Sequence, residues 1–362
     1  MQRNLKEFIP KKIDQRDVFI EEVEDKYLIK CNKIRPPKPI LIKQYLDYSE
    51  GLFEILGLYF GDGTNTNKNS GNRRVALANT SLELHKMWIS FLEKLGIHKK
   101  QMYAQVQIRR ETELNQNQLI NYWSKSTKIP SQRFSNVSYK DYKTKKYGVL
   151  VVNFNSKIFR KIFENIFGDS LKVCNKNIGY NQAFLRGLFA AEGCVVLNQN
   201  KSLSRLDIPI KDQKRRTYVH LLFKQNKIQC TETDKRLLIT GYINFRNAEK
   251  IKLAELHPEK QEKFNLAFKK LSESTSVPAL TKIKIIQSLK SQPKHRFQIA
   301  QELNKSSSLI HKLLRDLEIK RIVKKEKKII STGKKPIQLW KLIKEPKNNI
   351  ELTKWDYKGF GA

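Results

Sequence analysis

The chain of 362 residues carries 71 lysines and arginines against 35 aspartates and glutamates, which gives a formal net charge of +36. An excess of this size is typical of proteins that bind polyanions, and nucleic acid fits it better than a membrane surface does. No apolar run is long enough to span a membrane, and no secretory signal opens the sequence. We therefore expect a protein of the cytoplasm, associated with the nucleoid, or of an organellar matrix, that is not secreted and has no membrane partner.

The cysteines argue against both a disulfide framework and a zinc site. None of them forms a C-x-x-C pair or has a nearby histidine partner: Cys31, Cys174, Cys194 and Cys230. A reducing compartment is therefore expected. Cys194 is expected to be a small buried strand residue.

The first 49 residues are charged and end in a proline-containing run, so we expect a basic N-terminal extension at residues 1–49. A first repeat is expected at residues 50–180. It opens with an apolar helix, LFEILGLYFGDG, which ends at Asp62 and Gly63. Periodicity then predicts strands at RRVALANTS, MYAQVQIRR and KYGVLVVNFN, and helices at LELHKMWISFLEKLG and SKIFRKIFENIFG.

A second repeat is expected at residues 181–271, because the same order of elements recurs. Its helix, QAFLRGLFAAEG, ends at Glu192 and Gly193, 130 positions after the first acid and glycine. Strands are predicted at GCVVLNQN, SLSRLDIPIK and KRLLITGYINF, with a helix at RRTYVHLLFKQNK and a helical pattern that resumes at RNAEKIKLAEL. Two copies of an α-β-β-α-β-β-α unit in an α+β fold are the simplest account.

A polar linker at residues 272–278 precedes a segment of different character. Three short helical patterns, ALTKIKIIQSLKS, HRFQIAQELN and SSSLIHKLLRDLE, are followed by two β-prone runs, IKRIVKKEKKIIS and PIQLWKLIK. That order predicts a winged helix-turn-helix at residues 279–345, with a tail at 346–362. The β-prone region holds ten lysines and arginines and one glutamate, a density that favours contact with phosphates.

The two acids are candidates for one composite metal site. Small residues four positions apart would let the two apolar helices pack closely, so that Asp62 and Glu192 converge at their C-terminal ends. Helix ends also present free carbonyls, here those of Gly61 and Ala191. Such an all-oxygen, negative site suits Mg²⁺, with Mn²⁺ as a substitute, and supports hydrolysis of a phosphodiester. One acid before a glycine usually marks only a helix end, but two copies in register favour a metal site.

The motifs GLYFGDG and GLFAAEG resemble the paired signatures of the LAGLIDADG homing endonucleases, in their single-chain, two-repeat form, over about residues 36–256. The resemblance implies two pseudo-symmetric αββαββα repeats that form a β-saddle on double-stranded DNA. It also implies a monomeric, Mg²⁺-dependent, site-specific endonuclease. By position, Asp62 and Glu192 would be the catalytic, metal-binding acids, with backbone carbonyls from Gly61 and Ala191.

The sequence departs from the family in its basic residues. Family members usually carry a lysine late in each repeat, near the scissile phosphates. The late strands expected here offer Asn153 and Asn155, and then Tyr242 and Asn244. Metal binding is therefore a firmer expectation than turnover.

Strand alternation predicts a face that reads DNA. Glutamine and arginine suit bidentate contact with base edges, although any antiparallel sheet also has a solvated face. The DNA contacts predicted for the repeats are Arg73, Arg74, Tyr103, Gln105, Gln107, Arg109, Arg205, Asp207, Lys211, Lys224 and Lys235. Those predicted for the C-terminal domain are Ser307, Lys312, Arg315, Lys334 and Lys335.

Two other functions fit parts of the sequence. A non-catalytic transcriptional regulator would need the helix-turn-helix but not the acids. An RNA maturase would use the same fold to assist splicing, with intron RNA as its partner. The presence of both acids favours cleavage. No terminal His-Asn pair precedes a nucleophile, so a free-standing protein is expected rather than an intein.

Overall fold

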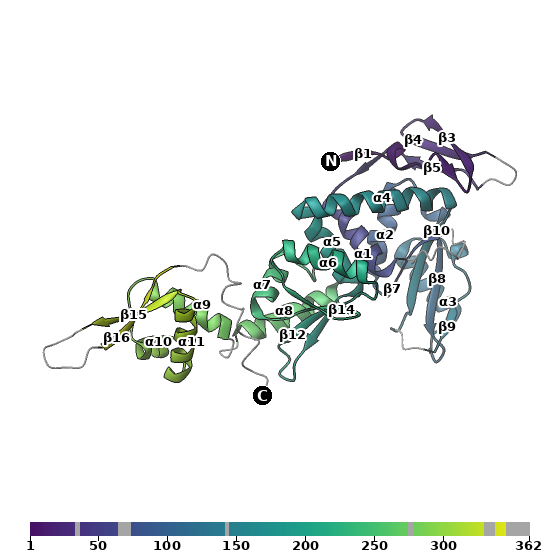
Figure 1. Cartoon of the computed structure of the whole chain (residues 1–362). Coiled ribbons are helices and arrows are strands. Elements are labelled where there is room, and N and C mark those ends of the chain that lie inside the picture. The colour runs from purple at the N-terminus through teal and green to yellow at the C-terminus, as the bar shows by residue number, and fades with distance from the viewer. Residues whose placement is uncertain (33–36, 64–73, 142–144, 274–277, 329–336, 345–362) are drawn as a thin grey trace.

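The computed structural model describes residues 1–32, 37–63, 74–141, 145–273, 278–328 and 337–344. The predicted residues Arg73, Lys334 and Lys335, the tail at 346–362 and most of the linker at 272–278 lie outside these residues. Figure 1 shows a helical body that carries several sheets, and a C-terminal unit beyond helix α8. The described fold is mixed α+β, as expected, and its strands pair mainly antiparallel. No described helix is both long and apolar enough to cross a membrane.

The described residues among the first 47 are folded onto the main body and are not a simple extension. Leu5, Phe8 and Ile13 are buried in the same core as the motif helices. Asn165 of α4 donates a hydrogen bond to the Phe8 carbonyl at 2.8 Å. Charged and apolar side chains alternate along these strands, as in a sheet with one solvated face. The strands were not predicted because the many charged residues resembled a solvated segment. The elements are β1 (Gln2–Asn4), η1 (Leu5–Phe8), β2 (Lys12–Ile13), β3 (Arg16–Val23), β4 (Lys26–Cys31), β5 (Ile40–Lys43) and β6 (Tyr45–Asp47).

The helices of the two repeats follow the predicted order, with additions. Both motif helices begin at side-chain caps, Ser49 and Asn177, and both end at the predicted acid. The helices are α1 (Glu50–Asp62), α2 (Leu82–Lys94), α3 (Gln116–Thr127), α4 (Lys157–Lys176), α5 (Ile178–Glu192), α6 (Gln213–Gln225), α7 (Tyr242–Lys250) and α8 (Pro258–Glu273).

Helices α1 and α5 cross at two glycines that lie 130 positions apart. A Cβ atom on Gly57 would lie 2.0 Å from the Phe184 carbonyl oxygen, and one on Gly187 would lie 1.8 Å from the Glu54 carbonyl oxygen. These contacts are reciprocal, because Glu54 and Phe184 are themselves 130 positions apart. The two helices are therefore related by a pseudo-twofold axis, and glycine is required at their crossing.

The two repeats share a sheet topology. In each, the last strand lies between two others: β10 between β7 and β8, and β14 between β12 and β13. The second sheet also includes β11, and in the first β9 pairs parallel with β8. Both sheets extend from the same side of the α1–α5 pair in Figure 1. The strands are β7 (Arg74–Asn79), β8 (Tyr103–Arg109), β9 (Ser138–Lys140), β10 (Val149–Asn155), β11 (Cys194–Leu197), β12 (Leu203–Pro209), β13 (Cys230–Glu232) and β14 (Arg236–Ile239).

Several elements were not predicted. Helix α3 is polar, and it is set by a capping box between Asn115 and Gln118. The strand predicted through KRLLITGYINF ends at Ile239, because Gly241 adopts a φ of +87° and α7 begins directly after it. Strands β9 and β13 are three residues long, too short to produce a periodic signal.

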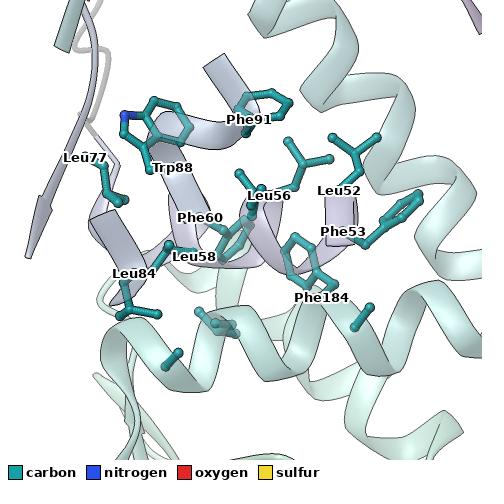
Figure 2. Close-up of a cluster of buried hydrophobic side chains, with 14 of the residues drawn as sticks. Leu52, Phe53, Leu56, Leu58, Phe60, Leu77, Leu84, Trp88, Phe91 and Phe184 are labelled. Carbon is teal, nitrogen blue, oxygen red and sulfur yellow. The ribbon is translucent and has the colours of Figure 1, made fainter. Parts of the chain in front are cut away.

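Aromatic side chains fix α1 to its neighbours. The rings of Phe60 and Phe184 meet edge to face at 5.3 Å, and Tyr59 stacks on Trp88 of α2 at 5.6 Å. Figure 2 shows Phe60, Trp88 and Phe184 among the apolar side chains around α1 and α2. Because the last turn of α1 is anchored on two sides, the carboxylate that follows it has a defined position.

The C-terminal unit has its own core. Leu313, Leu314 and Leu317 of α11 are buried against Trp340. The predicted order of three helices and two strands is observed, and the two strands pair antiparallel. The elements are α9 (Pro278–Leu289), α10 (Arg296–Glu302), α11 (Ser307–Ile319), β15 (Val323–Lys328) and β16 (Ile337–Leu342).

Candidate functional site

The C-terminal ends of α1 and α5 are in contact. A Cβ atom on Gly61 would lie 2.4 Å from the Ala191 Cβ and 3.0 Å from the Glu192 Cγ. Asp62 and Glu192 are the last residues of these helices, and both are partly buried. The structure therefore brings the two predicted acids to one place.

The glycine after each acid is required by lack of space. Gly63 and Gly193 both have extended backbone conformations, with φ of −73° and −63°, so the left-handed conformation that favours glycine is absent. A Cβ atom would lie 2.3 Å from the Tyr59 carbonyl oxygen in the first repeat and 2.3 Å from the Phe189 Cδ2 in the second. The acid–glycine pair is thus a packing feature that both repeats share.

Burial makes both acids easier to protonate, and the charge of Asp62 adds to this effect at Glu192. Burial raises the pKa of Asp62 to about 6, although Asn79 donates a hydrogen bond to its carboxylate at 2.5 Å. The pKa of Glu192 is also raised, first by burial and then by the negative charge of Asp62. A cation between the carboxylates would reverse both effects.

Lys260 of α8 is a basic group that the structure adds to this site. Its Nζ donates to the carbonyl oxygens of Phe189, Ala190 and Ala191 at 3.1, 2.6 and 3.0 Å. Burial lowers the pKa of Lys260 to about 8, whereas the charges of Asp62 and Glu192 act in the opposite direction. The Ala191 carbonyl, predicted as a metal ligand, is thus engaged by an ammonium group.

Lys260 lies in α8 and not in the late strands, where family members usually carry a lysine. Asn153 is buried in β10, and Tyr242 and Asn244 belong to α7, so the predicted strand positions were wrong for the second repeat. Lys260 lies in a charged run with Lys263, and no local pattern distinguishes the two. Only the contact between α8 and the end of α5 identifies it.

A cavity of about 290 Å³ lies beside Glu192, and two basic side chains line it. Lys211, predicted as a strand residue that contacts DNA, lies in the turn between β12 and α6 and lines this cavity. Arg215, which the sequence reasoning missed, lines it too and lies 3.8 Å over the ring of Phe60. Its pKa is lowered by burial. The cavity is lined by Phe60, Gly61, Leu188, Glu192, Pro209, Ile210, Lys211, Asp212 and Arg215.

The predicted polar face of β8 has the expected alternation. Tyr103 is exposed, and Gln105, Gln107 and Arg109 are partly exposed, whereas the residues between them are buried. Arg133 lies 5.4 Å from the Tyr103 ring. Arg74 is exposed at the start of β7. The accessible face of β8 is therefore polar or aromatic, as predicted.

On the second sheet, the prediction that Asp207 contacts DNA was wrong. Its side chain is 8% exposed, accepts a hydrogen bond from Arg205 at 2.8 Å and lies 3.5 Å from Arg236. The Asp207 carboxylate is too buried to contact DNA. It instead pairs with Arg205 and Arg236 and so orients their side chains. Lys224 lies in the last turn of α6 and Lys235 lies in the turn between β13 and β14, and both are exposed.

The residues predicted on the third helix of the C-terminal unit lie at its surface. Lys312 and Arg315 are exposed on α11, and Ser307 at its first turn is partly exposed. Their neighbours Leu313 and Leu314 are buried. The exposed face of α11 is therefore basic.

The cysteines are free, as predicted, but Cys194 is exposed at the start of β11 and is not the buried residue expected. Within the described ranges, no three histidine, cysteine, aspartate or glutamate side chains cluster as a metal site would require. Any metal ion at Asp62 and Glu192 would thus depend on main-chain carbonyls, water or substrate oxygens for its other ligands.

No protein-family model matches the sequence, and no curated protein matches it. Solved structures do. Structures of I-DmoI are among them. A crystal structure of I-DmoI in complex with DNA and Ca gives a TM-score of 0.36 and 19% identity, and covers 60% of this chain and 97% of I-DmoI. One with DNA and Mn gives a TM-score of 0.34 and 15% identity, and covers 57% and 97%.

A third match describes I-DmoI as a homing endonuclease, in a set of mesophilic variants. It gives a TM-score of 0.35 and 17% identity, and covers 57% of this chain and 98% of that chain. At these identities and TM-scores, the similarity to I-DmoI does not by itself assign an activity to this chain. The functional argument therefore depends on the geometry of the acids and of the groups around them.

Proposed function

We propose that this protein is a site-specific, divalent-metal-dependent endonuclease of double-stranded DNA, of the homing type. One observation carries the proposal: two glycine-crossed helices related by a pseudo-twofold axis end in one partly buried pair of acids, Asp62 and Glu192. The net charge of +36 favours binding of a polyanion. The acid pair would bind a cation where the polyanion is held.

The acid pair fits a hard divalent cation. Asp62, Glu192 and the Gly61 carbonyl offer oxygen donors only, which suits Mg²⁺, and Mn²⁺ would substitute for it. When bound, such an ion supplies Lewis acidity at a phosphodiester and promotes ionisation of the attacking water. Lys211 and Arg215 line the cavity beside Glu192 and would orient the phosphate through charge-assisted hydrogen bonds.

The two sheets would form the DNA-binding saddle. Side chains of β8 on the first sheet would read base edges, and Arg205 and Arg236, oriented by Asp207, would do so on the second. The C-terminal unit would act as a winged helix, with Lys312 and Arg315 of α11 near the DNA. The protein would act as a monomer, because both halves of the site lie in one chain.

The test is selection of cleaved sites from a randomised double-stranded DNA library in Mg²⁺, with Asp62→Asn and Glu192→Gln beside the wild type. Either substitution should lower the cleavage rate by about 10³-fold or more, since metal catalysis supplies several kcal/mol, and should spare DNA binding. Glu113→Gln, an exposed acid distant in sequence from both motifs, is the matched control and should cut normally.

The two alternative functions predict different outcomes. A regulator would bind one DNA sequence with strong salt dependence but nick no member of the library in Mg²⁺ or Mn²⁺. A maturase would stimulate intron splicing even with both acids replaced. Unchanged cleavage by Asp62→Asn and Glu192→Gln would contradict the assignment of the site.

A further inference from the structure

Lys260 makes more contact with the end of α5 than capping of the helix requires. The three hydrogen atoms of its ammonium group have three acceptors, the carbonyl oxygens of residues 189, 190 and 191, at 3.1, 2.6 and 3.0 Å. Gly193 already caps the helix, because its N–H donates to the Phe189 carbonyl at 2.9 Å. The lysine is therefore an additional cation at an end that has its own cap.

The position of this cation relates it to the acids. It lies at the carbonyl end of the helix whose last residue is Glu192, and it influences both carboxylates electrostatically. Its helix, α8, follows α7, the last helix of the second repeat, whereas in the first repeat α4 leads directly into α5. In the part of the chain that the structure describes, the first repeat therefore supplies no element equivalent to α8 for the end of α1.

We propose that Lys260 is a built-in counter-cation of the acid pair, which occupies the carbonyl end of α5 so that a divalent ion is held by Asp62, Glu192 and the α1 end alone. The proposal rests on the metal site proposed above and adds a difference between the two helix ends. The Ala191 carbonyl accepts a hydrogen bond from Lys260, whereas the Gly61 carbonyl would bind the metal. Lys260 is a positioning residue in this scheme, since it acts through the helix end and the acids.

The alternative is that Lys260 only caps a helix. Basic side chains near helix C-termini are common, and they stabilise the helix through its dipole. A cap would stabilise the fold equally whether or not the acids are charged. A counter-cation would stabilise it more when the acids are charged, because its removal leaves two buried carboxylates without compensation.

A double-mutant cycle in metal-free buffer separates the two. Lys260→Met should lower the melting temperature in the wild type by roughly 2–4 °C more than in the Asp62→Asn, Glu192→Gln background, the shift expected from about 1 kcal/mol of coupling. Lys263→Met, an exposed lysine one turn along α8, is the matched control and should give no coupling. Equal losses in the two backgrounds would show that Lys260 is only a cap.

Mn²⁺ titration followed by electron paramagnetic resonance counts the ions directly. The wild type should bind one ion, and Lys260→Met should bind Mn²⁺ at least about tenfold more tightly, since the two carboxylates lose a positively charged neighbour that is fixed at the end of α5. Lys260→Arg should restore the wild-type affinity. Equal affinity and number in Lys260→Met and wild type would overturn the proposal.

The two measurements also separate this proposal from the proposed function. If neither the wild type nor Lys260→Met binds Mn²⁺, the metal site is wrong, and so is the α1-side ion in the present proposal. The unfolding cycle still decides whether Lys260 compensates the acids, because it is measured without metal. Coupling there together with absent Mn²⁺ binding would mean that the lysine has replaced the metal altogether.

Discussion

The first and second repeats share a backbone plan but surround their acids with different chemistry. In the first, Asp62 accepts a hydrogen bond from Asn79 at the end of β7. In the second, alignment of the next helices, α2 and α6, from their capping residues puts Ile210 at this position, and Glu192 instead lines a cavity together with Lys211. The first acid is held by a neutral donor and the second is surrounded by cations.

Neither Lys211 nor Arg215 of the second repeat has a basic residue at the aligned position of the first. Helices α2 and α6 align from their capping residues, Ser81 and Asp212, which places Thr80 and Leu84 at the positions of Lys211 and Arg215. Leu84 is fully buried. The two repeats therefore share the residues that let the two helices touch and differ in the residues around the acids.

The largest expected effect tests what the repeats share. Gly57→Ala and Gly187→Ala should each destabilise the protein by at least about 3 kcal/mol, because the new methyl group would lie 2.0 or 1.8 Å from a backbone oxygen of the other helix. Chemical denaturation measures this. Gly168→Ala is the control, since a Cβ atom there meets nothing within 4 Å, and it should stabilise α4 by about 0.5–1 kcal/mol. Unequal effects at the two crossing glycines would contradict the pseudo-twofold relation.

The second prediction concerns one position that differs between the repeats. His85 is fully buried in α2, and burial lowers its pKa to about 4; the corresponding residue of α6 is Arg216, which pairs with Glu232 at 2.8 Å. The folded protein disfavours the charged histidine, so its contribution is present above the unfolded pKa of 6.5 and is lost as pH falls towards 4.

Urea unfolding at pH 7 and pH 4 measures this loss. The wild type should lose ~3 kcal/mol more than His85→Gln over that interval. His98→Gln, an exposed histidine, should keep the wild-type pH dependence. Identical slopes for wild type and His85→Gln would contradict the buried neutral state.

The third prediction uses the asymmetry at the acids. Arg215→Met should slow cleavage of one DNA strand by about 10-fold to 100-fold, the value of roughly 1.5–3 kcal/mol for a hydrogen bond from a charged group, and leave the other strand unaffected. Nicked DNA would then accumulate on a supercoiled substrate. Lys214→Met, an exposed neighbour, serves as the control. Equal slowing of both strands would mean that the two halves of the site are not chemically distinct.

The smallest expected effect is the change in stability when Asp62 loses its charge. The folded pKa of Asp62, about 6, lies above its ordinary value of 3.8, so the ionised carboxylate costs stability; this cost appears as pH rises from 3.8 to 6 and is constant above. Asp62→Asn should therefore stabilise the metal-free protein at pH 7 by about 1–3 kcal/mol and have no effect near pH 3. Differential scanning calorimetry at both pH values checks it, and a loss of stability at pH 7 would contradict the burial of this charge.

Much of the repeat architecture was visible in the sequence. Apolar periodicity and the spacing of Gly57 and Gly187 predicted two helices that cross closely, and alternation predicted the polar face of β8 around Gln105 and Gln107. The N-terminal strands were missed because their charge resembled a solvated segment. Strand β13 and the start of α7 were missed because a short strand and Gly241 leave no periodic signal.

The site was only partly predictable. The positions of Asp62 and Glu192 could be predicted from the repeat, because a similar motif occurs twice and similar motifs form similar helices. Lys260 contacts carbonyls about 70 positions earlier in the chain, and Asp207 is buried although alternation placed it outside. Local sequence determines helices, strands and their faces through backbone geometry. Which distant cation reaches an acid, and which polar side chain is covered, is decided only when the elements pack, since these contacts depend on the relative positions of whole elements.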